Sequence, residues 1–383
     1  MKLLFLTGSL VHGGAERHTI TLANRLAERG HECHAAYVKD DPAQLGRLRG
    51  AASVTCLKAR RYLDPLSVRE LARLIARRQP SVIVAANPYA LLYATLARRA
   101  ARQRAAIAAT FHTTAPGGAK EWLQMLYYRP FFWNAERLVF VCEAQRRYWN
   151  ARRLHARRDL VIHNGIDLEH WRPREPRERA LMRRVLGFAE HDFVVAMSAV
   201  LRPEKNHVQL VDAVARLRRR GIAARALLVG DGPTRAQVEA LARAAGLEDA
   251  VRITGFQQDV RPVLAAADAV ALCSLSETFP LAALEAMALA LPVVHSQVGG
   301  AAEMIAPGAN GLLFPARDTA ALAERLAAMA KPGVCARMGR AARQAVEARF
   351  SEPAMVDRYE STFYELDAER STRETLRRSA AAY

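Results

Sequence analysis

Short apolar segments alternate along the chain with longer segments in which apolar residues recur every three to four positions. The short segments are typical of buried strands, and the longer ones are typical of amphipathic helices. The alternation occurs twice, before and after about residue 170. This pattern predicts two doubly wound α/β domains with parallel sheets. The expected strands include 2–6, 34–38, 82–86, 106–111, 138–142 and 160–162, and then 194–200, 226–229 and 269–275.

The length of the chain also favours two domains, because 383 residues exceed the usual size of one hydrophobic core. We expect a first domain over residues 1–170 and a second over residues 171–354, with a linker at 171–176. Residues 351–369 are expected to be helical, and residues 371–383 are expected to fray.

The segment 274–288 carries the strongest candidate chemistry. It begins at the end of the expected strand 269–275, and its Ala-, Leu- and Met-rich second half predicts a helix that ends at Pro292. Ser276 and Thr278 are candidate N-caps of this helix. The segment is therefore a strand-loop-helix unit with polar residues in the loop.

Two glutamates lie eight residues apart in this unit, Glu277 in the loop and Glu285 in the helix, and Pro280 suits the first helical turn. Eight helical residues rise roughly 12 Å, and less where the loop bends, which matches the reach from the sugar to the ribose of a nucleotide sugar. The helix N-terminus would face the phosphates between them. The alternative is that both glutamates are solvated, which is the usual position of this residue type.

Two groups in the first half suit an anionic or polar ligand. Gly13 and Gly14 follow the first strand and open a helix, where doubly wound folds offer backbone N–H groups to phosphate. A plain tight turn has the same pattern. His112 follows the strand 106–111 at its carboxyl end, where open α/β sheets bind ligands, although a strand-end histidine is more often structural.

A loop in the second half carries two cations. Arg202 and Lys205 lie three residues apart after the strand 194–200, and both could reach a diphosphate, Arg as a fork and Lys as a point charge. The next strand, 226–229, is followed by Gly230 in a Gly-Asp-Gly-Pro loop.

The formal net charge of +18 is unevenly placed. Residues 1–170 hold 27 Lys and Arg against 13 Asp and Glu, whereas the remainder holds 29 against 25. A basic first half predicts an anionic partner, which is a nucleotide, a phospholipid surface or a nucleic acid. No apolar run approaches the ~20 residues that span a bilayer. Five scattered cysteines fit a reducing cytoplasm.

No metal site is expected from the sequence. The run from His31 to His34 straddles a helix end and a strand, so its side chains would point to different faces rather than converge on an ion.

Aromatic residues crowd one region beside Lys120 and Arg129. We expect most of them to pack in the core, and the alternative is that they dock with the cations on an anionic bilayer surface. A nucleic acid would accept such a patch, but the sequence contains no standard reader motif. These aromatic residues are Trp122, Tyr127, Tyr128, Phe131, Phe132 and Trp133.

Six motifs occur in a fixed order, which resembles that of the group 1 (family 4) retaining glycosyltransferases of GT-B fold. The resemblance runs from about residue 3 to about residue 360. It implies two Rossmann-like domains facing across a cleft, with a nucleotide sugar held mainly by the second, and a final helix from about residue 355 that packs back on the first. The motifs are Gly13-Gly14-Ala15-Glu16, Asn164-Gly165-Ile166-Asp167, Arg202-Pro203-Glu204-Lys205-Asn206, Val229-Gly230-Asp231-Gly232-Pro233, Glu277 with Glu285, and Gly299-Gly300 with Glu303.

The resemblance also implies roles for single residues. Arg202 and Lys205 would bind the diphosphate, Glu277 would bind a hydroxyl of the donor sugar, and Glu285 would bind the ribose hydroxyls. His112 is similar to the family histidine that lies against the donor sugar, and the loop at Gly13 and Gly14 would close on the phosphates. The other donor-binding candidates are Gly230, Phe256, Phe279, Pro280 and Leu281.

The chain departs from the family pattern at two positions. Pro280 stands where the family commonly has Gly, and Ala290 stands where Gly often precedes the Leu-Pro-Val-Val run. Because proline has no N–H, the loop that approaches the donor offers one backbone donor fewer.

The activity implied is the transfer of a hexose, with retention, from a nucleotide-diphosphate sugar to a hydroxyl of a glycan or lipid-linked acceptor. Cell-surface polysaccharide, lipopolysaccharide or glycolipid synthesis is the expected setting. The nucleotide sugar is a co-substrate, and we expect neither a cofactor nor a metal, since no Asp-x-Asp motif flanked by strand signals is present. We expect a cytoplasmic enzyme, and the basic first half suggests peripheral contact with the inner face of the cell membrane.

Two other classes of function remain at this stage. A nucleotide-sugar epimerase or a phosphorylase would share the fold. A basic nucleic-acid-binding α/β protein would explain the charge, but it leaves the ligand-type loops unexplained, so we expect no nucleic-acid partner.

Overall fold

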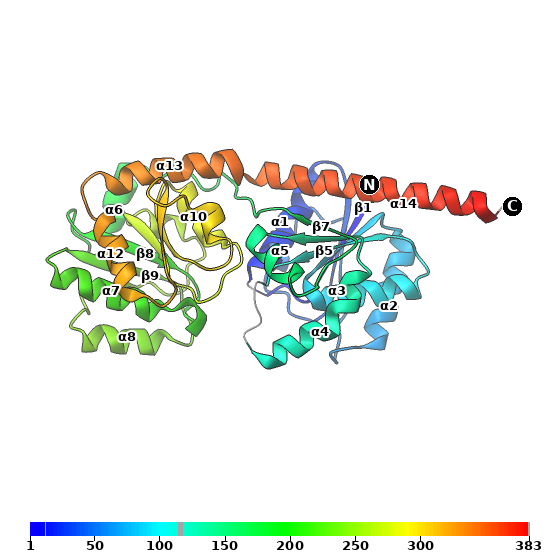
Figure 1. Ribbon diagram of the computed structural model, residues 1–383, viewed down its shortest axis with the longest axis horizontal. Helices are drawn as coiled ribbons and strands as arrows, with labels where there is room; N and C mark the ends of the chain where they lie inside the picture. The colour runs from blue at the N-terminus through cyan, green and yellow to red at the C-terminus, as the bar shows by residue number, and fades with distance from the viewer. Residues whose placement is uncertain (12, 114–117, 382–383) are drawn as a thin grey trace. The chain divides into compact units, whose positions relative to one another are not determined.

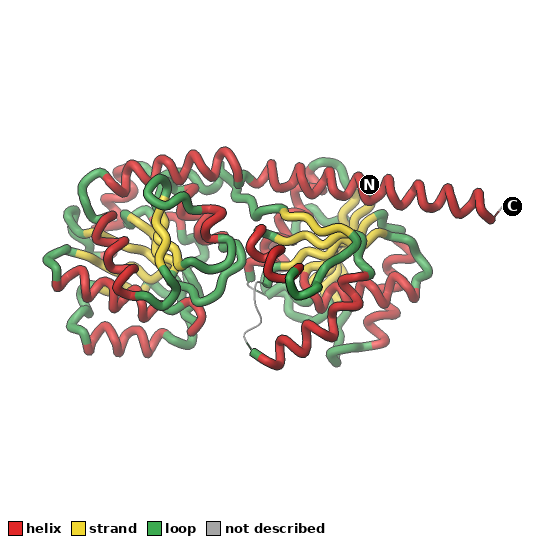
Figure 2. Tube along the Cα trace, viewed as in Figure 1, coloured by secondary structure: helices red, strands yellow, loops and turns green. Residues whose placement is uncertain are grey.

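The computed structural model describes residues 1–11, 13–113 and 118–381, which form two compact units (Figure 1). The first unit contains residues 1–164 together with the chain from Ala354 onward, and the second contains residues 165–353. Each unit has its own parallel sheet, with helices packed against it (Figure 2).

The sheet of the first unit has seven parallel strands in the order β3-β2-β1-β4-β5-β6-β7. Six of them lie within a few residues of the predicted strands. The edge strand β3 was not predicted, because its residues are half-buried or exposed and polar residues interrupt the apolar ones. The strands are β1 (Lys2–Thr7), β2 (Glu32–Tyr37), β3 (Ser53–Cys56), β4 (Val82–Ala86), β5 (Ala106–Phe111), β6 (Arg137–Phe140) and β7 (Arg158–Val161).

Alternate residues of these strands enter two cores, one on each face of the sheet. Leu4 and Leu6 of β1 pack with the apolar residues of the helices on one face. Leu3 and Phe5 pack on the other face with Leu22 and Leu26 of α1 and with Met355, Val356, Tyr359, Phe363 and Leu366 of α14. The helices of this unit are α1 (Gly14–Glu28), the 3₁₀ turn η1 (Leu45–Arg47), α2 (Pro65–Arg78), α3 (Asn87–Ala100), α4 (Ala119–Trp133), α5 (Glu143–Asn150) and α14 (Glu352–Ala381), whose first two residues belong to the second unit.

The sheet of the second unit has six parallel strands in the order β10-β9-β8-β11-β12-β13. They are β8 (Phe193–Ser198), β9 (Ala224–Val229), β10 (Val251–Ile253), β11 (Ala269–Leu272), β12 (Val293–Ser296) and β13 (Gly311–Phe314). The helices are α6 (Pro176–Leu186), the 3₁₀ turn η2 (Pro203–Lys205), α7 (His207–Arg219), α8 (Arg235–Ala244), α9 (Arg261–Leu264), α10 (Leu281–Ala288), α11 (Ala301–Met304), α12 (Thr319–Met329) and α13 (Val334–Arg349).

The two sheets have the same topology, and the prediction of two Rossmann-like parallel α/β domains is confirmed. In each sheet the strand order reverses beside the first strand, between β1 and β4 in the first unit and between β8 and β11 in the second. Ligands of doubly wound sheets bind outside the carboxyl ends of the strands at such a switch point. The loops after β8 and β11 are therefore the positions where the second unit is expected to bind a ligand.

The helix after β11 differs from the prediction at both ends. Its N-cap is Pro280, without a side-chain cap bond, so the expectation that Ser276 or Thr278 caps it was wrong. The helix ends at Ala288, before Pro292, because Ala290 takes a left-handed conformation with φ +58°. A residue with positive φ cannot continue a right-handed helix.

One expectation about a connecting segment was also wrong. Trp171 is buried in the second unit, where its carbonyl accepts a hydrogen bond of 2.6 Å from the Arg343 guanidinium, so the start of the expected linker is part of a core. Helix α14 continues to Ala381, well into the tail that was expected to fray.

Candidate active site

The loop after β8 carries Lys205 and is fixed by the Gly-Asp-Gly loop after β9. Leu201 donates its N–H to the carbonyl of Asp231 at 3.0 Å, and its own carbonyl accepts from Thr234 at 3.0 Å. A Cβ on Gly230 or Gly232 would lie within 3.0 Å of the backbone of this loop, and both glycines have positive φ. Only glycine therefore allows the two loops to approach so closely.

Lys205 and Glu277 meet at the switch point of the second sheet. Lys205 Nζ donates to Glu277 Oε1 at 2.5 Å, and Ser274 Oγ donates to the same oxygen at 2.7 Å. The side chains of Lys205 and Glu277 are 27% and 12% exposed, so this is a largely shielded ion pair. A shielded carboxylate with two donors is held in one orientation, as a group that binds a ligand requires.

The Glu277 loop is supported from two sides. Leu275 donates its N–H to the carbonyl of Glu204 at 2.8 Å, which ties the loop after β11 to the loop after β8. On the other side, Gly300 donates its N–H to the carbonyl of Thr278 at 2.7 Å. A Cβ on Gly299, which has φ +53°, would collide with the backbone carbonyl of Glu277. The Gly-Gly motif thus serves to let the chain pass directly against the Glu277 loop.

Two buried histidines lie near the Lys205–Glu277 pair, and neither was singled out by a motif. Burial, aided by the charge of Lys205, lowers the pKa of His207 to about 4. Burial also lowers the pKa of His295, which the charge of Glu277 opposes, and His295 Nδ1 lies 2.7 Å from the Ser296 carbonyl oxygen. Both rings are neutral at neutral pH, so they add polar groups but no charge beneath the pair.

Helix α10 places Glu285 on its second turn, where it is only 6% exposed. The alternative that Glu277 and Glu285 are solvated surface residues was therefore wrong. Phe279, which precedes the helix, is buried and packs edge-on against Phe350 with ring centroids 5.4 Å apart. Phe279 is thus a packing residue that anchors the loop between the two glutamates, while Pro280 and Leu281 are half-buried at the start of the helix.

The remaining candidates of the second unit are more exposed. Arg202 is in the same loop as Lys205, but its side chain is 57% exposed and lies 4.0 Å from Glu204. Phe256 is 71% exposed, and the backbone bridge between Gly230 and Gly255 holds it beside the Gly-Asp-Gly loop. An exposed aromatic ring next to a glycine-rich loop offers a face on which a planar ligand group can stack.

In the first unit, Gly13 is the N-cap of α1 and has no side-chain cap, and Gly14 is the first helical residue. The preceding residue of the predicted loop, His12, lies outside the described residues. Glu16 in the first turn is partly desolvated, which raises its pKa. The helix therefore begins with backbone N–H groups at the carboxyl end of β1.

His112 lies directly after β5 and is packed against other rings. Its ring centroid lies 4.9 Å from that of His18 on α1, and the His18 ring lies 5.3 Å from that of Tyr359 on α14. Burial lowers the pKa of His112 to about 4 and lowers the pKa of His18 as well. His112 is therefore a neutral imidazole at neutral pH, which can exchange hydrogen bonds with a hydroxyl but supplies no positive charge.

The structure thus brings Lys205, Glu277 and Glu285 to the carboxyl end of the second sheet, with Arg202 and Phe256 in adjoining loops. Gly13, Gly14 and His112 lie at the corresponding end of the first sheet. Among the described residues, no three His, Cys, Asp or Glu side chains are grouped so that they could hold a metal ion. No helix in the same described part of the chain is both long and apolar enough to cross a membrane.

Two Rossmann-like units with polar groups at the switch points are typical of GT-B glycosyltransferases. Residues 12–170 match the family described as Glycosyltransferase Family 4, and residues 178–345 match Glycosyl transferases group 1. EpsD of Bacillus subtilis (strain 168), which carries the name of a glycosyltransferase, is 30% identical over 298 residues, covering 76% of this chain and 77% of EpsD. The chain belongs to the group 1 glycosyltransferases.

Other similar proteins support the same family and fold. WcaL of Escherichia coli (strain K12), named as a colanic acid biosynthesis glycosyltransferase, is 30% identical over 45% of this chain and 42% of WcaL. Several further relatives likewise match over about half of their length. The crystal structure of Anabaena Alr3699/HepE in complex with UDP is 24% identical, covers 95% of this chain and 100% of that protein, and has a TM-score of 0.85.

Proposed function

We propose that the protein transfers a sugar, with retention of configuration, from a nucleotide-diphosphate sugar to an acceptor hydroxyl. The observation that carries this proposal is the shielded Lys205–Glu277 pair at the switch point of the second sheet. Solved structures of similar fold contain UDP and UDP-glucose, which supports a nucleotide sugar as the donor.

Lys205 and Arg202 are the groups proposed to bind the diphosphate. A lysine ammonium has three donors, and one of them goes to Glu277, so two remain for phosphate oxygens. The exposed guanidinium of Arg202 is free to turn toward the same anion as a fork. The N-terminal end of α10 adds a favourable dipole. Together these groups stabilise the negative charge that grows on the diphosphate as the glycosidic bond breaks.

Glu277 is proposed to accept a hydrogen bond from a hydroxyl of the donor sugar, and Glu285 is proposed to bind the ribose hydroxyls. Gly230, Phe256, Pro280 and Leu281 complete the donor site in this proposal. Phe279 contributes by packing, since its ring is buried against Phe350.

The first unit is proposed to supply Gly13, Gly14 and His112. As a neutral imidazole, His112 would hydrogen-bond to the sugar rather than stabilise the leaving diphosphate. Because the acceptor attacks from the face that the diphosphate leaves, its proton passes to a phosphate oxygen and configuration is retained. This route requires no nucleophile from the enzyme and no metal, so EDTA is expected to leave the rate unchanged.

The central experiment compares Lys205→Ala and Arg202→Ala with Lys331→Ala, which removes an exposed lysine of the same unit. Thermal-shift measurements with UDP-, GDP- and ADP-sugars first identify the donor, because a ligand of the native state raises its stability. Release of nucleoside diphosphate from that donor is then followed. Each site variant is expected to lose about 10²–10³-fold in rate, as for removal of other transition-state donors. Rates equal to that of Lys331→Ala would contradict the proposal.

We also propose a setting at the inner face of the cell membrane, in cell-surface polysaccharide, lipopolysaccharide or glycolipid synthesis. The name of WcaL supports the polysaccharide option. All five cysteines are free thiols, which fits a reducing cytoplasm.

Helix α4 is the proposed membrane contact, because several of its apolar side chains are exposed in the basic half of the chain. Leu123 and Tyr127 are 70% and 48% exposed, whereas Tyr128 and Phe132 are buried in the core. Vesicles of phosphatidylglycerol are expected to sediment the protein, and Leu123→Ser/Leu126→Ser is expected to abolish this. The control is Leu181→Ser/Val185→Ser, which removes an exposed apolar pair from α6. Equal binding by both double variants would rule out α4.

A further inference from the structure

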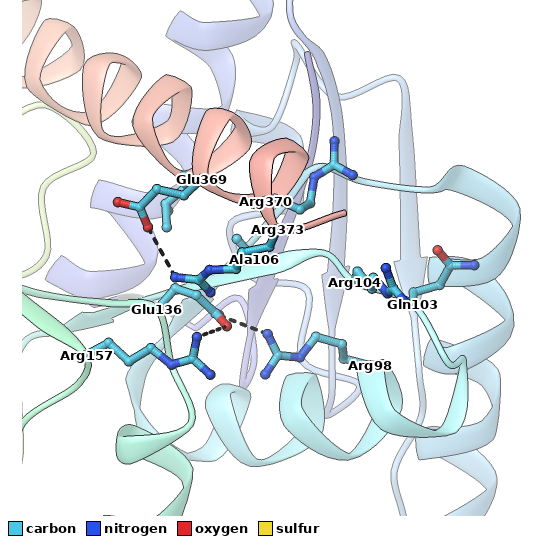
Figure 3. A pocket seen from close by; sticks show the side chains of 10 residues that line it. Arg98, Gln103, Arg104, Ala106, Glu136, Arg157, Glu369, Arg370 and Arg373 are labelled. Carbon is cyan, nitrogen blue, oxygen red and sulfur yellow. Dashed lines mark hydrogen bonds and ion pairs between the residues drawn. The ribbon is translucent and has the colours of Figure 1, made fainter. Parts of the chain in front are cut away.

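A cavity of about 400 Å³ lies at the amino end of the first sheet, beneath α14 (Figure 3). Ala106 begins β5, Glu136 precedes β6, and Arg157 precedes β7, so the floor of the cavity consists of the starts of three neighbouring strands. Helix α14 supplies the opposite wall. Five arginines line the cavity, namely Arg98, Arg104, Arg157, Arg370 and Arg373.

One side of this cavity is a charge network centred on Glu136, whose side chain is largely buried. Arg98 donates to Glu136 at 2.9 Å and also to the carbonyls of Ala105 and Asn134, at 3.1 and 3.2 Å. Arg157 approaches the other carboxylate oxygen at 3.8 Å, so the two guanidinium groups point toward Glu136 from either side (Figure 3). The N–H of Ile107 also donates a hydrogen bond to Glu136, at 2.8 Å. These contacts hold Arg98 in place whether or not a ligand is present.

On the other side, one glutamate of α14 is shared among several arginines. Glu369 lies 2.7 Å from Arg137, 3.3 Å from Arg158 and 3.6 Å from Arg373. The hydrogen bond from Arg137, aided by the positive charges of the neighbouring arginines, lowers the pKa of Glu369. Arg137 also lies 3.6 Å from Glu365, so two carboxylates face three guanidinium groups and this side remains positive.

The cavity therefore has an excess of positive charge. Its lining holds five arginines against two glutamates. Among the side chains that the structure describes, the excess remains three when four neighbours that pair with these groups are included, namely Arg137, Arg158, Glu365 and Asp367. A concave site with an excess of positive charge favours an anionic ligand.

We propose that this cavity binds a phosphoryl group, as a phosphate or diphosphate dianion or a larger polyphosphate. The planar guanidinium fork matches phosphate geometry, and the volume falls in the range of small-ligand pockets, roughly 300–1,000 Å³. The anion is carried either by a soluble phosphoryl compound or by the headgroup of an anionic lipid. Because Arg104 and Arg157 belong to the body of the unit and Arg373 to α14, one bound anion links the helix to the sheet.

This site is separate from the proposed donor site. It lies at the amino end of β5, whereas His112 lies beyond the carboxyl end of that strand, and six residues of strand separate the ends by roughly 16 Å. Lys205 and Glu277 belong to the other unit. A phosphoryl ligand in this cavity is thus not the diphosphate of the donor.

The test uses the full chain with Arg202→Ala/Lys205→Ala as background, which removes the other candidate phosphate site. In this background, Arg104→Gln/Arg373→Gln removes two cations of the cavity. Both residues are exposed, and the ion pair from Arg373 to Glu369 is long, at 3.6 Å, so the fold is expected to survive. The matched control is Arg73→Gln/Arg77→Gln, which removes two exposed arginines from α2. Circular dichroism checks each variant, and Arg104→Gln alone replaces the pair if the pair unfolds.

Two assays distinguish a soluble phosphoryl compound from a lipid headgroup. They are titration calorimetry with sodium tripolyphosphate and sedimentation with phosphatidylglycerol or phosphatidylcholine vesicles. We expect the cavity variant to bind tripolyphosphate at least tenfold more weakly than the background, and the control to bind within about twofold. A loss of phosphatidylglycerol binding in the cavity variant alone, with tripolyphosphate unbound throughout, would assign the site to a lipid headgroup. If the cavity variant equals the control with both ligands, the proposal is overturned.

Discussion

Replacing Gly299 by alanine tests whether the Gly-Gly motif positions Glu277. The new methyl group would meet the carbonyl oxygens of Glu277 and Thr278 well inside 3.0 Å, and the backbone at Gly299 has φ +53°. An alanine in this left-handed conformation costs about 1–2 kcal/mol. Relieving the overlap requires the Glu277 loop to move, and overpacking of this kind costs about 1–3 kcal/mol more.

Gly308 is a matched control within the same unit. It has φ +85°, but a Cβ there would meet no atom within 4 Å, so Gly308→Ala has the conformational cost without the collision. For a unit of this size, 1 kcal/mol lowers Tm by about 2–4 °C. We therefore expect Gly308→Ala to lower Tm by about 2–8 °C, and Gly299→Ala to lower it by about 4–20 °C, always more than the control.

Differential scanning calorimetry measures both shifts, and the release of nucleoside diphosphate from the donor measures the effect on the site. Since a displacement of about 1 Å in a catalytic group can cost 10²-fold in rate, Gly299→Ala is expected to lose activity at temperatures where it remains folded. Gly308→Ala should keep the wild-type rate. Equal Tm values and equal rates for the two variants would refute the idea that Gly299 supports the Glu277 loop.

Three further predictions concern stability. The pKa of His112 is lowered to about 4 from an unfolded value of about 6.5, so its contribution to the unfolding free energy is complete above pH 6.5 and falls by about 2 kcal/mol between pH 7 and pH 5. Urea titrations should show that this loss is reduced in His112→Gln. An unchanged pH profile in the variant would contradict the burial of the ring. Arg183 is buried and donates to Asp268 at 2.6 Å and to the Ala266 carbonyl at 3.0 Å. Arg183→Ala should therefore lower the unfolding free energy, measured in urea, by about 3–5 kcal/mol. A loss below 1 kcal/mol would show that its acceptors find other donors. Glu369→Gln weakens the contacts of α14 with Arg137 and Arg158, so the amides of residues 359–369 should exchange faster than in the wild type, while those of α10 stay protected. Exchange rates in residues 359–369 that equal those of the wild type would contradict this role of Glu369.

The parallel sheets were predictable because their strands are apolar on both faces. Strands such as β4 and β5 match their predicted bounds, since a strand covered by helices on both sides has a continuous apolar run. The edge strand β3 was not predicted, because it pairs with a strand on one side only and its side chains are half-buried or exposed. The end of α10 was predicted too late in the chain, because nothing in the local sequence shows that Ala290 takes a positive φ.

Part of the candidate site was predictable, because its residues lie in loops that directly follow predicted strands. Lys205 and Glu277 were identified from loops that follow strands, and the structure places their side chains in contact. His207 and His295 were missed, because a histidine acquires its environment from tertiary packing rather than from its neighbours in sequence. The arginine cavity was missed for the same reason, since Arg98, Arg157 and Arg373 come together from three distant segments.

The first unit is closed by residues that are far from it in sequence. The face of its sheet that carries Leu3 and Phe5 is covered by side chains of α14, about 190 residues after the unit's first segment ends at Asn164. At roughly 5–20 residues per second, a ribosome needs about 10–40 s to cross that interval. During each round of translation the second unit can therefore fold before the first is complete. Until α14 is made, the part of this face that α1 does not cover exposes apolar side chains, which makes the nascent chain a substrate for chaperones that bind such surfaces.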